Sequence, residues 1–222
     1  MAEFKPEVLP IFATPFGVVS VPEAESINAK VAELLAQRAT PKRRDPLFRP
    51  AFAFRSRDDL LQWDDEPVRV LTSGIIGGAI SVVRSINDFS DEQFATLRLQ
   101  ARAWFTIVRE NGYVAAANHP NTAWCAVYCV AAPEPAISRY DSGVLRLHES
   151  LRTTMFSDAT NGATHMPYLP GHSSWRPVPG QLAVFPASIT HEIALLRSAG
   201  SLVLITMLLR FLGPDQTGTP WW

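Results

Sequence analysis

The side chains of this sequence that could bind a transition metal are above all its histidines, of which there are five. Two of them flank segments that favour strands. His119 precedes the apolar run 124–130, and His191 follows the apolar run 181–186, which opens on Pro179-Gly180. Two imidazoles with an oxygen donor on one face hold iron(II) and leave positions open for a co-substrate and oxygen. His119 and His191 are therefore the candidate metal ligands.

Each of these histidines could instead be an ordinary loop residue, hydrogen-bonded and inert, because His is commonly half-buried in proteins. Their joint placement, one before an early strand and one after a Pro-Gly strand unit, favours a metal site. In a jelly-roll the two positions would converge at the mouth of the barrel. A hydrolase that uses Ser188 or Ser201 with His191 is disfavoured, because the sequence has no Gly-x-Ser-x-Gly elbow.

Beyond residue 112 the sequence consists of short apolar runs separated by Gly, Pro, Asn and Ser turns. The runs span 113–117, 124–132, 143–148, 181–186, 191–196 and 201–211. Strands at this spacing, without intervening helices, indicate a sandwich or barrel of the jelly-roll type. We expect an α+β, mainly β protein with a double-stranded β-helix (jelly-roll) core. The stretch 161–179 is long enough to form a lid over its mouth.

The first 110 residues are expected to support this barrel with helices and loops. Residues 8–21 predict an extended segment in which two prolines exclude a central strand. Ser26 is expected to cap a helix that ends at Arg38, and residues 39–67 to form a loop anchored by Trp63. The helices would pack on the outside of one sheet. We expect one domain over residues 1–222, with the jelly-roll core at 111–212.

A second helical region is predicted over residues 68–110, in two parts. Gly74, Gly77 and Gly78 are expected to break the first part in a turn, since a GxxGG pattern without a following Lys-Ser/Thr is no phosphate loop. Asp88 or Ser90 could cap the second part, in which apolar residues recur at helical spacing. These residues are Phe94, Leu97, Ala101, Trp104, Phe105 and Val108.

Composition excludes several classes of function. Of the 222 residues 47% are apolar and 18% charged, and the net charge is −1, so the chain can bury a core and has no field that favours nucleic acid or anionic membranes. The basic run 42–44 predicts a solvated loop. No uninterrupted apolar stretch reaches the ~18 residues of a membrane span, and no signal-peptide pattern begins the chain, so a cytoplasmic protein is expected. Cys125 and Cys129 are expected to be buried on one strand face.

The sequence resembles a family of 2-oxoglutarate/iron(II) oxygenases over about residues 9–211. That family carries a Phe-x-Thr-Pro opening, a His-x-His-Pro-Asn motif before a strand, a Gly-x-Leu-x-Phe strand, and a Pro-x-x-Gly-x-Leu-x-x-Phe-Pro-x-x-x-x-His block. The last block is the most specific. The matching residues are Phe12-Ala13-Thr14-Pro15, Asn28, Trp104, His119-Pro120-Asn121, Val127-Tyr128-Cys129-Val130, Gly143-Val144-Leu145-Arg146-Leu147 and the run from Pro179-Gly180 to His191.

The resemblance implies iron(II) and 2-oxoglutarate as cofactors, but the chain departs from the pattern at the metal site. Ala117 replaces the first His of His-x-His. If His119 is the first ligand, Asn121 stands where a carboxylate would usually be, and a neutral amide oxygen is a poorer donor than Asp. The expected metal set is therefore His119, His191 and, more weakly, Asn121.

The arginine that should follow the distal His and bind the far carboxylate of 2-oxoglutarate is also missing, since Ser201 and Leu202 occupy that position. Arg152, Arg197 or Arg146 could replace it, because a guanidinium matches a carboxylate in a bidentate fork. Arg152 is favoured, since it follows the Gly-x-Leu-x-Phe strand. Tyr128 is assigned to cofactor binding together with Arg152 and Arg197.

The resulting hypothesis is an iron(II)/2-oxoglutarate-dependent dioxygenase that oxidises a small-molecule substrate, by hydroxylation or another oxidation, with O2 as co-substrate. The alternative is a degenerate, non-catalytic jelly-roll that has lost its metal and acts as a binding or partner subunit. Ala117 and the missing arginine motivate the alternative. Neither hypothesis calls for nucleic acid or membrane, and both leave a homodimer open.

Overall fold

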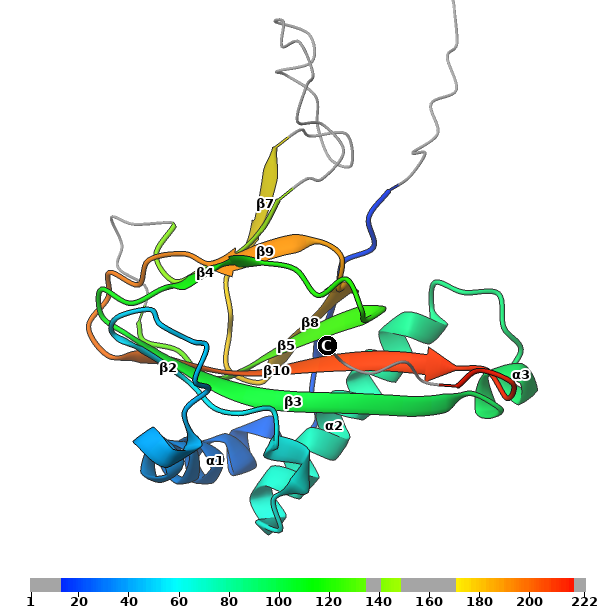
Figure 1. The fold of residues 1–222 in the computed structure, drawn as a ribbon, viewed down its shortest axis with the longest axis horizontal. Coiled ribbons are helices and arrows are strands. Elements are labelled where there is room, and N and C mark those ends of the chain that lie inside the picture. Colours follow the sequence, from blue (N-terminus) through cyan, green and yellow to red (C-terminus); the bar gives the residue numbers. More distant parts are fainter. Residues whose placement is uncertain (1–12, 135–140, 149–170, 218–222) are drawn as a thin grey trace, which may run out of the picture.

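Two antiparallel β-sheets face each other in the computed structural model, with helices outside the larger one (Figure 1). The structure describes residues 13–134, 141–148 and 171–217. The larger sheet has the order β1-β8-β5-β10-β3-β2, and the smaller one β4-β9-β6-β7. The predicted mainly β jelly-roll is confirmed. The strands are β1 Gly17–Ser20, β2 Ala53–Arg55, β3 Arg98–Arg109, β4 Val114–Ala117, β5 Trp124–Ala131, β6 Leu145–His148, β7 His172–Trp175, β8 Gln181–Pro186, β9 Thr190–Ile193 and β10 Ser201–Leu212.

The central strands of the larger sheet are buried on both faces, because one face meets the smaller sheet and the other meets the helices. Strand β5 shows the alternation: Cys125, Val127 and Cys129 belong to the core between the sheets, whereas Ala126 and Tyr128 belong to the core beneath the helices. Both cysteines are fully buried on one face, as predicted. Burial on two faces explains why these strands read as continuous apolar runs.

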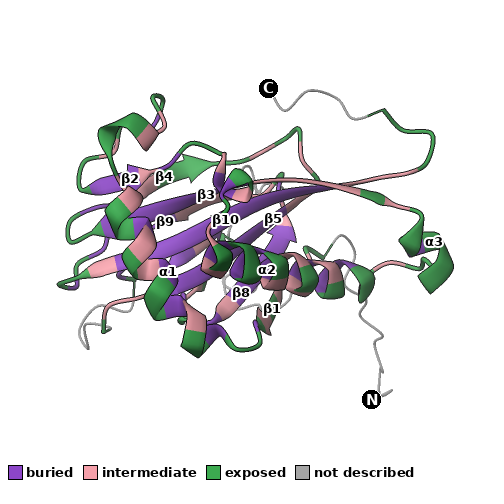
Figure 2. Cartoon of the chain, turned by 90° about the horizontal axis from the view of Figure 1, so that it is seen from below, coloured by how far each residue is buried: buried purple, intermediate pink, exposed green. Residues whose placement is uncertain are grey.

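The helices α1 (Ala24–Arg38), α2 (Glu66–Arg84) and α3 (Asp91–Ala95) lie outside the larger sheet, and their exposed sides face away from it (Figure 2). The predicted packing of helices on one sheet is therefore confirmed. The start of α1 differs from the prediction, because the N-cap residue is Glu23. Ser26 lies in the first turn, where its hydroxyl donates to the Glu23 carbonyl.

Helix α2 runs unbroken through its three glycines, so the predicted turn there is wrong. A Cβ on Gly78 would come within 2.9 Å of Leu182 Cδ2, and one on Gly74 within 2.8 Å of Val21 Cγ1. These two glycines therefore allow the helix to approach the sheet closely. By length and composition α2 could also cross a membrane, at a mean hydropathy of 1.3. Here its seven buried residues face into the protein.

The second predicted helix of residues 68–110 is also wrong: only the short α3 is helical, and residues 98–109 form β3. Ser90 does cap α3, in a capping box with Gln93. In β3 the side chains alternate, so that Phe105 and Ile107 join the core beneath the helices and Trp104 joins the core between the sheets. Apolar residues on both faces produced a spacing that also fits a helix.

The N-terminal segments meet their predictions in part. Strand β1, which begins two residues after Pro15, is an edge strand, and the prediction that this segment forms no central strand is confirmed. The predicted loop 39–67 contains β2, which pairs with β3 at the opposite edge of the sheet. Trp63 is buried, in edge contact with the Phe105 ring (centroids 5.8 Å apart), so it anchors this segment on the helix side of the sheet. The part of the predicted lid within the described residues contains the short strand β7.

Candidate metal centre and carboxylate site

A cavity of about 60 Å³ between the two sheets brings the two predicted histidines together. The ring centroids of His119 and His191 are 5.5 Å apart. Ala117 lines the same cavity, as expected from the alternation of side chains before His119. The remaining lining residues are Arg55, Trp104, Thr106, Val114, Ala115, Val127, Leu145, Glu192, Ile193, Leu204 and Thr206.

Strand pairing fixes the relative position of these residues. Ala117 at the end of β4 is the direct partner of His191 near the start of β9. The turn that follows β4 is fixed by a backbone hydrogen bond, in which the His119 N–H donates to the Ala187 carbonyl (2.8 Å). Asn118 turns the other way, and its amide donates to the Ser188 carbonyl. The site is therefore assembled from two neighbouring strands and the turns at their ends.

The His191 ring is held in the orientation that a metal ligand needs. Its Nδ1 lies 2.9 Å from the Ile189 carbonyl oxygen. A carbonyl can only accept, so Nδ1 carries the proton, and Nε2 presents its lone pair. Second-sphere hydrogen bonds of this kind set the tautomer and direction of metal-binding histidines. The Cys125 Sγ is 4.0 Å from Nε2. Burial raises the pKa of this thiol, so its neutral S–H can donate to Nε2 only when no metal is bound there.

Both imidazoles are neutral at pH 7. Burial, followed by the nearby His191, Arg55 and Arg102, lowers the pKa of His119 to about 4. Burial also lowers the pKa of His191, against the opposing effect of its bond to Ile189. A neutral imidazole is the form that binds a metal, so neither ring has to lose a proton first.

The cavity contains an arginine that the sequence analysis missed. Arg55 comes from β2, and its guanidinium lies over the Trp104 ring, with Cζ 4.1 Å from the centroid. Trp104 also touches the His119 ring at 5.6 Å between centroids. The alternating segment Ala51-Phe52-Ala53-Phe54-Arg55 is a strand signal that could have identified Arg55 as an inward-facing residue.

No carboxylate of the described residues joins the two histidines. Among residues 13–134, 141–148 and 171–217, no group of three or more His, Cys, Asp or Glu side chains is arranged to hold a metal ion. Asn121 is exposed and does not line the cavity; its backbone carbonyl accepts from Arg210 Nε (2.7 Å). The carboxylate of Glu192 accepts from Arg146 (2.8 Å). The predicted role of Asn121 as a third ligand is therefore not supported by its position.

The predicted cofactor-binding residues lie away from the cavity or outside the described residues. Tyr128 points to the opposite face of β5, where its hydroxyl donates to Asn28 Oδ1 (2.8 Å), so its assignment is wrong. Arg197 is exposed in the loop before β10, and Arg146 alternates with the inward-facing Leu145 and is paired with Glu192. Arg152 falls outside the described residues.

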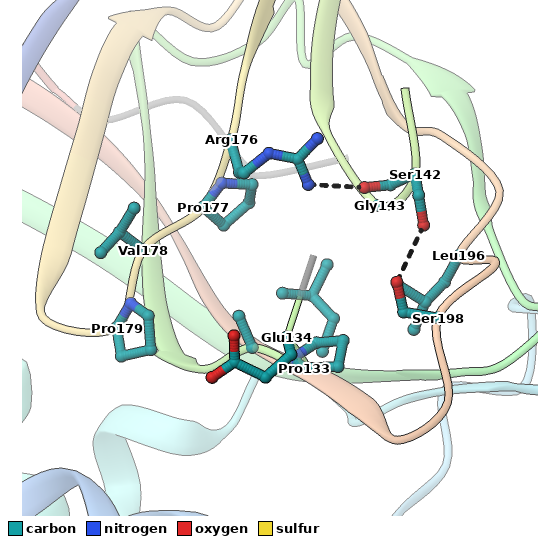
Figure 3. Close-up of a pocket in the computed structure, with 12 residues that line it drawn as sticks. Pro133, Glu134, Ser142, Gly143, Arg176, Pro177, Val178, Pro179, Leu196 and Ser198 are labelled. Atoms are coloured by element: carbon teal, nitrogen blue, oxygen red, sulfur yellow. Dashed lines mark hydrogen bonds between the residues drawn. The ribbon is translucent and has the colours of Figure 1, made fainter. Parts of the chain in front are cut away.

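A larger cavity, of about 250 Å³, lies at the other end of the barrel (Figure 3). It is bounded by residues that precede β6 and follow β9, whereas His191 lies near the start of β9. Arg176 donates to the Ser142 carbonyl there, and the Ser142 and Ser198 hydroxyls are 3.5 Å apart. Its lining contains neither His nor Cys. The candidate metal centre is therefore the smaller cavity.

The fold and this cavity define a jelly-roll protein with a candidate two-histidine metal centre, and comparison with known proteins adds a family-model match over part of the chain. Residues 102–205 match the family model described as "Putative 2OG-Fe(II) oxygenase". A search of curated proteins gave no match. The family-model match covers 104 of the chain's 222 residues.

Solved structures with this fold have low sequence identity to the chain. A Pseudomonas putida prolyl-4-hydroxylase has a TM-score of 0.59 at 14% identity, covering 89% of this chain and 93% of that one. HygX from Streptomyces hygroscopicus, with nickel and 2-oxoglutarate bound, has a TM-score of 0.59 at 12% identity, covering 94% of this chain and 86% of that one. The non-heme alpha-ketoglutarate-dependent epimerase SnoN from nogalamycin biosynthesis has a TM-score of 0.60 at 12% identity, covering 94% of this chain and 82% of that one. At these identities the likeness shows the fold.

Proposed function

We propose that this protein is an iron(II)/2-oxoglutarate-dependent oxygenase that hydroxylates a small-molecule substrate, with His119 and His191 as metal ligands. The observation that carries the proposal is the pair of neutral imidazoles in one jelly-roll cavity, with the His191 tautomer fixed by the Ile189 carbonyl. The family match of residues 102–205 supports it. When bound, iron(II) and 2-oxoglutarate supply the reduction of O2, coupled to decarboxylation of the co-substrate.

The donors fit iron(II) in kind but provide only part of a ligand set. Two imidazole nitrogens and an open remainder suit a non-heme iron that must also bind a co-substrate. With Ala117 opposite His191, the described residues provide no third side-chain ligand. We expect weaker metal binding than in a site with two histidines and a carboxylate. Water and co-substrate oxygens would fill the remaining positions.

The other cavity residues would orient the reactants and exclude water. Val127, Leu145, Leu204 and Ile193 form an apolar wall beside the two histidines. Such a wall limits the access of solvent and holds a substrate C–H bond toward the metal. The Ile189 carbonyl keeps the proton on His191 Nδ1 throughout, so Nε2 stays available to the metal.

The test is metal binding by the full chain and its His191→Ala variant, measured calorimetrically with Mn(II) as a stand-in for iron(II). His191→Ala should weaken Mn(II) binding by about 100-fold or more, because one of two nitrogen ligands is lost, while thermal unfolding is little changed. The matched control is His148→Ala, a histidine on a neighbouring strand that lies outside the cavity. It should bind Mn(II) like the wild type.

Two results would contradict the proposal. Full Mn(II) binding by His191→Ala would show that the site is elsewhere. A wild-type chain that binds neither Mn(II) nor 2-oxoglutarate would favour the non-catalytic binding subunit instead. Micromolar 2-oxoglutarate affinity that requires the metal supports the oxygenase, and product analysis with O2 then identifies the oxidation.

A further inference from the structure

Arg55 occupies an unusual position for a cationic side chain. In β2, Phe54 belongs to the core beneath the helices and Ala53 to the core between the sheets, so Arg55, two residues after Ala53, faces inward. Its cross-strand partner is Thr106 of β3, which lines the cavity as well. The edge strand outside the predicted jelly-roll core thus delivers a guanidinium to the cavity that holds the two histidines.

The hydrogen-bonding capacity of this guanidinium is largely unused. Arg55 Nε is buried without an acceptor, and no hydrogen bond found in the described part of the chain involves the guanidinium group. Asp45 approaches Nε at 3.4 Å and provides a counter-charge. Burial lowers the pKa of Arg55, yet arginine stays charged in proteins. A partly buried guanidinium of this kind, with its Cζ 4.1 Å from the Trp104 ring centroid, is suited to bind an anion in a bidentate fork.

The surroundings favour a carboxylate over other ligands. Thr106 and Thr206 bring two buried hydroxyls to the cavity wall. The acidic residue in the lining is Glu192, whose carboxylate is bound by Arg146. The cavity therefore offers a cation at Arg55, hydroxyls at Thr106 and Thr206, and metal-binding nitrogens at His119 and His191. The Trp104 ring contacts both Arg55 and His119.

We propose that Arg55 binds the far carboxylate of 2-oxoglutarate, in place of the strand arginine that this chain lacks after His191. The inference rests on the proposed function and deepens it. Three other arginines near the barrel already donate a hydrogen bond, Arg102 to Asp58, Arg146 to Glu192 and Arg210 to the Asn121 carbonyl. None of these three lines the cavity. Within the described residues the Arg55 guanidinium has the 3.4 Å ion pair with Asp45 but no hydrogen bond.

The test compares two 2-oxo acids on the Mn(II)-loaded full chain by calorimetry. 2-Oxopentanoate keeps the metal-binding end of 2-oxoglutarate and replaces the far carboxylate with a methyl group. Arg55→Gln should weaken 2-oxoglutarate binding by about 10- to 100-fold, the range for hydrogen bonds to a charged group. It should leave 2-oxopentanoate binding unchanged. The control is Arg197→Gln, at an exposed arginine outside the cavity, which should bind both acids like the wild type.

The outcomes separate this inference from the proposed function. If the wild type binds 2-oxoglutarate and Arg55→Gln keeps that affinity, the Arg55 assignment is overturned and the oxygenase proposal stands. An equal loss of both acids would show a structural role and also overturn it. No 2-oxoglutarate binding by the wild type overturns both. If Arg55→Gln does not fold, Arg55→Lys, which keeps the charge but not the fork, should still lose affinity for 2-oxoglutarate alone.

Discussion

The two sheets of this barrel differ in how they are buried. The larger sheet has twelve-residue strands, β3 and β10, and packs against both the helices and the smaller sheet. Within the described residues, each strand of the smaller sheet spans four residues. One of its faces packs on the core between the sheets, whereas Arg146 and Glu192 are only half-buried and pair with each other.

Because of this difference, the larger sheet contributes most to folding stability, while the smaller sheet contributes residues of the candidate site. The larger sheet supplies most of the buried apolar surface, which is the main source of folding free energy, and it contributes Trp104, Thr106 and Arg55 as fixed walls. The smaller sheet supplies His191 and Ala117 from short strands with few buried side chains. Substitutions in the smaller sheet should therefore alter binding more readily than they unfold the domain.

The largest expected effect is on stability, when a buried leucine is replaced by alanine in one sheet and, separately, in the other. Leu182→Ala in β8 should lower the free energy of unfolding by about 4 kcal/mol, because this fully buried side chain lies between the sheet and α2. Leu147→Ala in β6 should cost about 2 kcal/mol, at the lower end of the range for such changes. Urea unfolding measures both. Equal losses would show that the two sheets contribute alike.

How far the sequence could predict this fold depends on the period of its apolar residues. The strands after residue 112 were predictable, because Pro and Gly turns separate runs of strand length. Strand β3 was not, since inward Trp104 and outward Phe105 and Ile107 fill both faces and leave no period of two. Helix α2 was predicted to break at Gly78, because the sequence does not reveal that the missing Cβ makes room for Leu182.

A second prediction concerns Ala117, which lies in the smaller sheet directly opposite His191. Ala117→His should add a nitrogen donor to the cavity and tighten Mn(II) binding by about 100-fold, the contribution of roughly one ligand in a structural metal site. Because Ala117 is exposed, the domain should unfold at nearly the same urea concentration. Calorimetry and urea unfolding check the two parts. Weaker Mn(II) binding would mean that the new imidazole crowds the site.

The smallest expected effect separates two neighbouring glycines of α2. Gly77→Ala should raise the free energy of unfolding by about 0.5–1 kcal/mol, because alanine favours the helix and the added Cβ has no neighbour within 4 Å. Gly78→Ala should lower it, since its Cβ would lie 2.9 Å from Leu182 Cδ2 and 3.1 Å from Val19 Cγ2. Thermal unfolding compares the pair. A stabilising Gly78→Ala would show that the contact with the sheet is loose.

The candidate site was predictable where its residues stand beside strand boundaries. His119 and His191 could be paired because a jelly-roll brings those boundaries together. Arg55 was missed because it lies in a proline-rich segment that predicted a loop, and its short alternation was not used. Tyr128 was misassigned because a motif match does not say which face of a strand a side chain occupies, and a one-residue difference reverses that face.

The bond between His191 Nδ1 and the Ile189 carbonyl has a consequence for evolution and for engineering. The acceptor is backbone, so no side-chain substitution at Ile189 removes it, provided that the turn from β8 to β9 is kept. The orientation of the His191 ring is therefore conserved as long as the backbone of the turn is conserved, whichever side chain stands at position 189. A lineage could lose or exchange other ligands and still keep one correctly aimed imidazole from which a metal site can be rebuilt.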